Sequence, residues 1–165
     1  MLALGMLATT QASTPDQPNT GRLPIDFQAT DLHGVPFHGI SLKGKTVLLD
    51  FWAVWCPPCI KAFPVLGRLD TDLKGKDFQV LGIAVFSGTV EDVANFVEEY
   101  EVTYQVVIGD EDLVEWFGVI GYPTYFLISP EGAIANKYVG DWPDLYENVK
   151  ADVAALMKLP HEKEE

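Results

Sequence analysis

The sequence is poor in the residues that bind nucleic acids and metals. Its 165 residues include 11 Lys and Arg against 24 Asp and Glu, which gives a formal net charge of −13 at pH 7. Phosphate recognition depends on clustered positive charge, so this balance argues against a nucleic-acid partner. The three histidines, His33, His38 and His161, show no ligand spacing to the cysteines. Two cysteines alone cannot complete a four-ligand zinc site, and we expect neither a metal nor a bound cofactor.

Long apolar runs are also missing. No stretch approaches the roughly 18–20 apolar residues that cross a bilayer, so we expect no membrane span. The short run Leu2–Ala8 leads to Ala12 and resembles the end of a secretory signal peptide, although the positively charged segment that normally precedes it is absent. A Pro- and Ser-rich linker follows. We predict a signal remnant and linker at 1–23, one domain at 24–159 and a charged tail at 160–165.

This reading favours an exported, extracytoplasmic protein. The alternative is that the apolar start is not a signal at all, which would leave the protein in the cytoplasm. Fusion of the first residues to a secretion reporter distinguishes the two.

Strand and helix patterns alternate along the chain. Thr46–Ala53 is an apolar run broken only by Asp50, which is typical of a central strand buried on both faces. Pro57 and Pro58 are tolerated in the first turn of the following helix, which we expect to reach about Lys74. A hairpin is expected around Asp31–Gly34, and further strands are expected at Phe78–Phe86, Tyr104–Ile108, Tyr125–Ser129 and Ile134–Val139. Further helices are expected at Val90–Tyr100, Asp110–Phe117 and about Trp142–Leu159. Their caps, in the same order, are Thr89, Asp110 and Asp141.

Strands that alternate with helices predict βαβ units and a parallel core. The last two strands form a hairpin that adds an antiparallel edge. The predicted class is therefore α/β, with a mixed central sheet, helices on both of its faces and an N-terminal hairpin.

The two cysteines, Cys56 and Cys59, are only three positions apart. A disulfide that closes so short a loop stabilises a fold weakly, so a structural staple does not explain the pair. Cys56 stands where the predicted helix begins, and the unpaired N–H groups and dipole of a helix N-terminus favour a thiolate. Cys59 lies one turn further on, where it can attack a mixed disulfide formed on Cys56. The pair therefore predicts thiol–disulfide exchange.

Asp50 is the one charged residue in the central apolar run. Burial of a carboxylate costs free energy unless the group is paired or neutral, so its pKa should rise. Buried acids with shifted pKa values cluster at functional sites. We predict that Asp50 acts in proton transfer, the alternative being a carboxylate satisfied by backbone donors.

Phe51 to Cys59 (FWAVWCPPC) resembles the signature of the thioredoxin superfamily. A longer match, with Asp26-Phe27, Ser41 to Lys45, Phe63-Pro64 and Gly121 to Thr124, is similar to TlpA/ResA-type extracytoplasmic thiol–disulfide oxidoreductases. The resemblance implies a thioredoxin-like three-layer α/β/α fold. It also implies a cis peptide bond at Tyr122–Pro123, and a substrate-docking surface formed by Trp55, Pro57, Pro58, Tyr122 and Pro123.

Two positions depart from what the resemblance implies. Many ResA-type proteins carry a glutamate three residues after the second cysteine, where this chain has Ala62, so that role cannot be transferred. The strand at Phe78–Phe86 lacks the lysine that thioredoxins usually place beside their buried aspartate. Asp50 is therefore the single local acid–base candidate. It stands six residues before Cys56, which resembles the cytosolic-thioredoxin pattern of a buried aspartate beneath the second cysteine, and this implies proton exchange with Cys59. Trp52, on the same strand, is expected to be core.

The leading hypothesis is an enzyme that reduces protein disulfides, with a Cys56–Cys59 disulfide as its only redox group. The resemblance implies a monomer that is recharged by another thiol protein, with apocytochrome c among its substrates. The alternatives are a cytosolic thioredoxin-like reductant, a thioredoxin-fold metal-binding or chaperone module, and a peroxidase related to peroxiredoxins. The last shares the lead-in at Asp26–Lys45, but its Pro-x-x-x-Thr/Ser-x-x-Cys motif is absent.

Overall fold

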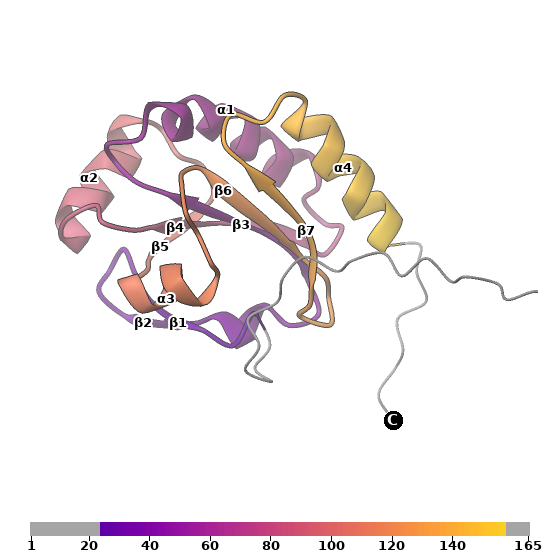
Figure 1. Cartoon of the computed structure of the whole chain (residues 1–165), viewed down its shortest axis with the longest axis horizontal. Helices are drawn as coiled ribbons and strands as arrows, with labels where there is room; N and C mark the ends of the chain where they lie inside the picture. Colours follow the sequence, from indigo (N-terminus) through magenta and orange to yellow (C-terminus); the bar gives the residue numbers. More distant parts are fainter. Residues whose placement is uncertain (1–23, 158–165) are drawn as a thin grey trace, which may run out of the picture.

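The computed structural model describes residues 24–157 (Figure 1). The predicted signal remnant and linker at 1–23 and the charged tail at 160–165 lie outside these residues. Within them, seven strands form one sheet in the order β2-β1-β5-β4-β3-β6-β7.

Three parallel strands form the centre of this sheet. β3 (Thr46–Trp52) pairs in parallel with β4 (Phe78–Ala84), and β4 pairs in parallel with β5 (Gln105–Ile108). Every residue of β3 is buried, as its continuous apolar run predicted. Strands with this pattern are covered on both faces, and β3 therefore lies in the middle of the molecule.

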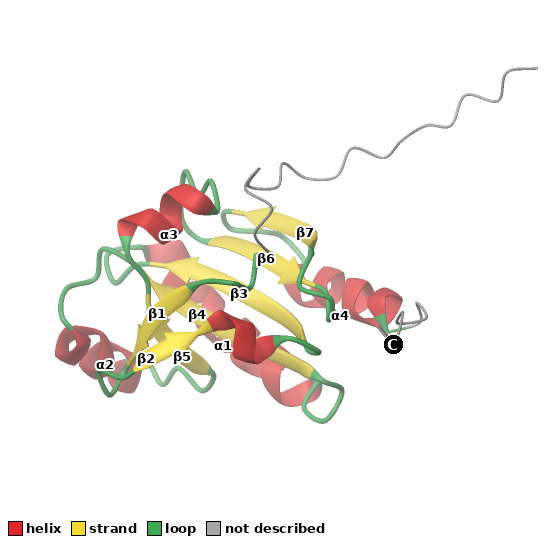
Figure 2. Cartoon of the chain, turned by 90° about the horizontal axis from the view of Figure 1, so that it is seen from below, coloured by secondary structure: helices red, strands yellow, loops and turns green. Residues whose placement is uncertain are grey.

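Antiparallel strands complete both sides. β6 (Thr124–Ile128) pairs with β3, and β7 (Ile134–Val139) pairs with β6. On the other side, the hairpin of β1 (Gln28–Asp31) and β2 (Pro36–His38) joins the sheet through β5 (Figure 2). The predicted mixed sheet and N-terminal hairpin are both confirmed.

Helices cover the two faces of the sheet unequally. α1 (Pro57–Asp72), α2 (Val90–Glu99) and α4 (Leu145–Leu156) pack on one face, and α3 (Glu111–Trp116) packs on the other with a short 3₁₀ helix at Gly39–Leu42 (Figure 1). Each face has its own apolar cluster. Leu48 and Trp52 of β3 belong to the cluster under α1, whereas Leu49 and Phe51 belong to the opposite one. This is the three-layer α/β/α arrangement.

Two of the three predicted helix caps are present. The Thr89 hydroxyl accepts the N–H of Asp92, whose carboxylate accepts the N–H of Thr89 in return, which forms a capping box at α2. Asp110 accepts the N–H of Leu113 at 2.9 Å and caps α3. These caps satisfy N–H groups that the first helical turn leaves without partners.

The prediction for the last helix was wrong at its start. α4 begins at Leu145 rather than near Trp142, and Asp144, not Asp141, occupies the N-cap position without a side-chain cap bond. Trp142 precedes Pro143, and the proline ring disfavours a helical conformation for the residue before it. Asp144 is itself left-handed, with φ 57°, so the helix can begin only after it.

Candidate active site

The two cysteines form a disulfide at the N-terminus of α1. Cys56 is the N-cap residue of the helix, and its sulfur accepts the backbone N–H of Cys59 at 3.3 Å. Pro57 and Pro58 occupy the first two helical positions and have no N–H to donate, so the amide of Cys59 is the first donor of the helix. That amide and the helix dipole would both stabilise a thiolate on Cys56 once the disulfide is reduced.

The remaining site residues meet at one edge of the sheet, the edge formed by the carboxyl ends of the parallel strands. β3 ends at this edge, just before Cys56, and the antiparallel strand β6 begins there, just after Pro123. The Tyr122–Pro123 peptide bond is cis, as the resemblance implied. The Tyr122 ring lies edge-on to the ring of Trp55, with 5.7 Å between the centroids. Trp55 and Tyr122 are 67 positions apart in the sequence, and they are in contact because Trp55 follows β3 and Tyr122 precedes the neighbouring strand β6.

The five residues predicted to form the substrate-docking surface differ in how exposed they are to solvent. Trp55 is 59% exposed and Pro57 is exposed, whereas Pro58 and Tyr122 are half-buried. Pro123 is buried, and its carbonyl accepts the N–H of Gly140 at 2.8 Å, which ties it to the end of β7. Trp55 and Tyr122 are therefore the large side chains of this set that a partner protein can touch.

Two apolar side chains at the same edge were not predicted. Phe86 was expected at the end of the strand Phe78–Phe86, but β4 ends at Ala84, and Phe86 lies in the following loop and is 53% exposed. Ile120, two residues before Tyr122, is 96% exposed. The carbonyl of Phe86 accepts the indole N–H of Trp55 at 3.1 Å, and its backbone is left-handed, with φ 50°. A bulky residue rarely adopts this conformation. The signal available in the sequence was topological, because the carboxyl ends of adjacent parallel strands lie at the same edge of a sheet.

Asp50 lies in the interior of the sheet rather than at its edge. It stands between Leu48 and Trp52 on β3, and alternation along the strand places its side chain on the face that α1 covers. The same apolar cluster contains Cys59. Asp50 is only 1% exposed, and one carboxylate oxygen accepts the hydroxyl of Tyr104 at 3.1 Å.

Burial raises the pKa of Asp50 to about 7, and the hydrogen bond from Tyr104 acts in the opposite direction. The predicted direction of the shift is confirmed. A carboxyl with this pKa exists in both protonation states near neutral pH, which is the condition for accepting and returning a proton. Tyr104 was missed in the sequence because nothing in a lone tyrosine 54 positions away indicates that it reaches this strand.

The expected departures from the family pattern are visible in the structure. Ala62 is half-buried and carries no polar group toward the site. Trp52 is fully buried, as predicted, and stacks edge-on against Phe63 of α1 with 5.1 Å between the ring centroids. Its side chain is part of the core that holds α1 on the sheet.

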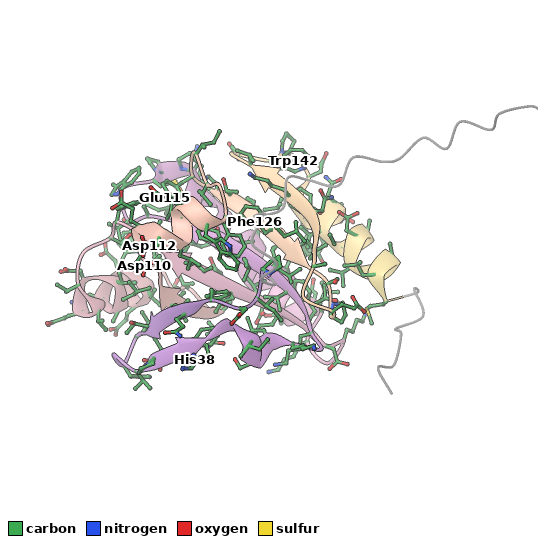
Figure 3. All side chains as sticks on the ribbon, turned by 60° about the horizontal axis from the view of Figure 1, so that its bottom comes forward. His38, Asp110, Asp112, Glu115, Phe126 and Trp142 are labelled. Carbon is green, nitrogen blue, oxygen red and sulfur yellow. A yellow bond between two sulfur atoms is a disulfide. The ribbon has the colours of Figure 1, made fainter. Side chains whose placement is uncertain are left out.

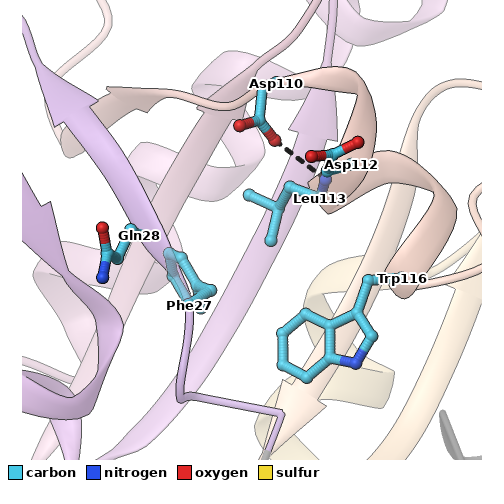
Figure 4. Close-up of a pocket in the computed structure, with 6 residues that line it drawn as sticks. All are labelled: Phe27, Gln28, Asp110, Asp112, Leu113 and Trp116. Atoms are coloured by element: carbon cyan, nitrogen blue, oxygen red, sulfur yellow. Dashed lines mark hydrogen bonds between the residues drawn. The ribbon is translucent and has the colours of Figure 1, made fainter.

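A hollow of about 160 Å³ opens between Phe27 and α3 (Figure 4), and the Asp110 carboxylate beside it accepts the N–H of Leu113 and caps the helix. The acidic residues Asp110, Asp112 and Glu115 lie along α3 on the outside of the molecule (Figure 3).

Within residues 24–157 no group of three or more His, Cys, Asp or Glu side chains is arranged to hold a metal ion. No helix in the same range has the length and apolar character needed to cross a membrane.

A cysteine pair at the start of the helix that follows the central strand, on a three-layer α/β/α fold, defines a thiol–disulfide oxidoreductase of the thioredoxin-like class. The comparison with known proteins gives the family. The chain belongs to the AhpC/TSA family, whose model matches residues 20–137.

Individual relatives agree with this assignment. The thiol–disulfide oxidoreductase ResA of Bacillus cereus is 31% identical over 130 residues, which cover 78% of this chain and 75% of that protein. A solved structure from Chlorobium tepidum, named as a candidate DsbE thiol:disulfide interchange protein, is 28% identical with a TM-score of 0.75 and covers 84% of this chain and 98% of its own. A thiol:disulfide interchange protein from Bacteroides is 32% identical with a TM-score of 0.68, over 77% of this chain and 85% of its own. The predicted resemblance to ResA-type oxidoreductases is confirmed.

Proposed function

We propose that this oxidoreductase works outside the cytoplasm as a reductase of protein disulfides, with the cysteines of an apocytochrome c as the candidate substrate. The observation that carries the direction of electron flow is the buried Asp50, whose pKa burial raises to about 7 on the face of the sheet beneath α1. A base that removes the proton of Cys59 at neutral pH speeds the step that releases a reduced partner.

The reaction begins with the reduced protein. The thiolate of Cys56 attacks one sulfur of the partner's disulfide, which forms a mixed disulfide and releases the partner's other sulfur as a thiolate that takes up a proton. Cys59 then gives its proton to Asp50, and its thiolate attacks the sulfur of Cys56. This attack closes the Cys56–Cys59 disulfide and releases the partner's second sulfur, which is protonated in turn. Two electrons pass from the dithiol to the partner.

The docking surface consists of Trp55, Tyr122, Pro123 and the exposed Phe86 and Ile120. Apolar side chains at a protein surface are a common mark of an interaction site. The partner's segment beside its cysteine would lie across Trp55 and Tyr122, with Pro57 and Pro58 shaping the approach to Cys56. The protein acts as a monomer without a further cofactor, and an upstream thiol protein reduces its disulfide again.

Trapping tests the assignment of the two cysteines. In Cys59→Ser the mixed disulfide on Cys56 cannot resolve, so partner proteins should accumulate in covalent complexes that dithiothreitol releases. The matched control, Cys56→Ser, should trap none. Complexes that form on Cys59 and not on Cys56 would reverse the roles of the two residues.

The direction of electron flow is tested by the reduction potential. Pairs of this type range from about −270 mV for thioredoxin to about −120 mV for a strong oxidant. We expect a value near the reducing end. A value near −120 mV would identify an oxidant instead, and turnover of hydrogen peroxide without transfer to protein thiols would identify a peroxidase.

A further inference from the structure

Only one of the two carboxyl oxygens of Asp50 accepts a hydrogen bond from the described residues. Its Oδ2 atom accepts the hydroxyl of Tyr104, which is itself buried. Its Oδ1 atom is buried too and has no hydrogen-bond partner among the residues that the structure describes. The carboxyl therefore has one oxygen fixed by Tyr104 and one that remains available.

Tyr104 reaches Asp50 across an intervening strand. It comes directly before β5, and β4 lies between β5 and β3. In the register of the sheet Asp50 pairs with Gly82, and Gly82 pairs with Val106. A Cβ atom on Gly82 would lie 3.0 Å from the Tyr104 ring, which is tighter than an ordinary contact. The same Cβ atom would lie 3.0 Å from the Trp52 indole nitrogen, so the absence of a side chain at Gly82 leaves room for both rings where Tyr104 crosses β4.

Few ionisable groups face Asp50 in the described residues. They are Tyr104 before β5 and Tyr125 on β6, and Cys59 of α1 belongs to the apolar cluster on the same face of the sheet. The charge of Asp50 contributes to the raised pKa of both tyrosines, although burial is the larger cause for each. No Lys, Arg or His contributes to the pKa shift of Asp50. The hydroxyl of Tyr104 is thus the group in this set that stabilises the charged carboxylate.

We propose that Tyr104 is a positioning residue for Asp50: its hydroxyl, reaching across Gly82, fixes Oδ2 and leaves Oδ1 to exchange the proton of Cys59. The inference rests on the proposed proton transfer between Asp50 and Cys59, and it assigns that reaction a residue from outside the cysteine motif. It also explains how the buried carboxylate of Asp50 on β3 functions although the neighbouring strand β4 carries no lysine.

The direct test is the titration of Asp50 in the oxidised protein, where the cysteines do not titrate. We expect Tyr104→Phe to raise the midpoint of the Asp50 carboxyl, followed by ¹³C NMR, by about one unit, a tenfold change in proton affinity, because a hydrogen bond to the charged form is lost. Tyr138→Phe is the matched control, since Tyr138 is also buried and also donates to a carboxylate, that of Asp152. It should leave the Asp50 midpoint unchanged.

A second variant keeps the hydroxyl and moves the ring. Gly82→Ala places a methyl group 3.0 Å from both the Tyr104 ring and the Trp52 indole nitrogen, so where the Tyr104 ring gives way it should shift the Asp50 midpoint in the same direction as Tyr104→Phe. An unchanged midpoint in Tyr104→Phe would overturn the inference, whatever the result for Gly82→Ala.

Kinetics separate this inference from the proposed function. The rate at which the reduced protein reduces insulin disulfides should rise with pH through a midpoint that Tyr104→Phe moves upward. In an Asp50→Asn background, Tyr104→Phe should have no further effect on the pH profile, because the tyrosine acts through the carboxyl. A profile that Asp50→Asn leaves unchanged would refute the role of Asp50. A profile that responds to Asp50→Asn but not to Tyr104→Phe would refute only the role of Tyr104.

Discussion

Asp50 should make the folded protein less stable as the pH rises. Burial raises the pKa of Asp50 from 3.8 to about 7 in the folded state. Below about pH 4 the group is protonated in both states and has no effect on the free energy of unfolding. Between these two values the unfolded chain releases the proton while the folded protein keeps it, so stability falls as the pH increases. Each unit of pKa difference corresponds to about 1.4 kcal/mol, which gives about 4 kcal/mol in total.

Substitution of Asp50 by Asn isolates this effect. Asparagine has the same shape, can still accept the hydroxyl of Tyr104 and does not ionise. The other acidic groups titrate alike in both proteins, so their contributions cancel in the difference. We expect the stability of Asp50→Asn relative to the parent to rise by about 4 kcal/mol between pH 4 and pH 8, with most of the change between pH 4 and pH 7.

The measurement is urea unfolding of the oxidised protein, followed by tryptophan fluorescence at a series of pH values. Trp52 is fully buried and should report the loss of the core. Asp112→Asn, which removes an exposed carboxylate on α3, controls for the change in net charge. A difference between Asp50→Asn and the parent that stays constant from pH 4 to pH 8 would show that Asp50 ionises like an ordinary carboxyl, and the proton-transfer argument would fail with it.

Two further predictions concern stability alone. Thr89→Ala removes the capping box of α2 and should lower the free energy of unfolding by about 1 kcal/mol in chemical denaturation, and a loss below a few tenths would show that the cap is not formed in solution. Gly39→Ala places a Cβ atom 2.5 Å from the backbone carbonyl of Ile25 and should cost about 1–3 kcal/mol, measured in the same way, whereas a neutral result would mean that the chain before β1 can move aside.

Much of this fold could be predicted because its local signals agree with each other. The apolar run that forms β3, the cap at Thr89 and the turn before Gly34 each act within a few residues, so a sequence pattern is sufficient to find them. The start of α4 was mispredicted because two local signals competed there. Asp141 resembles a cap, but the backbone at Pro143 and Asp144 prevents a helix from beginning so early.

The residues of the candidate site also fall into those that local sequence predicts and those that depend on the arrangement of the strands. Cys56, Cys59 and Asp50 could be predicted, because each is anomalous within its own segment. Tyr104 and Phe86 could not, because their importance depends on which strands become neighbours. Tyr104 is significant only if β4 separates it from Asp50 and presents a glycine at the crossing point, and that register is set by the whole sheet rather than by the residues near Tyr104.

The two prolines after Cys56 have a consequence for how the two sulfurs depend on each other. Since neither proline has an N–H, the backbone donor that reaches the sulfur of Cys56 belongs to Cys59. Cys59 therefore has two roles: its backbone amide donates a hydrogen bond to the sulfur of Cys56, and its own sulfur later attacks the mixed disulfide and releases the partner. The amide still donates to that sulfur in the disulfide form, after the second step is complete. One backbone amide of the second cysteine thus supports the sulfur of the first at the end of the catalytic cycle as well as at its start.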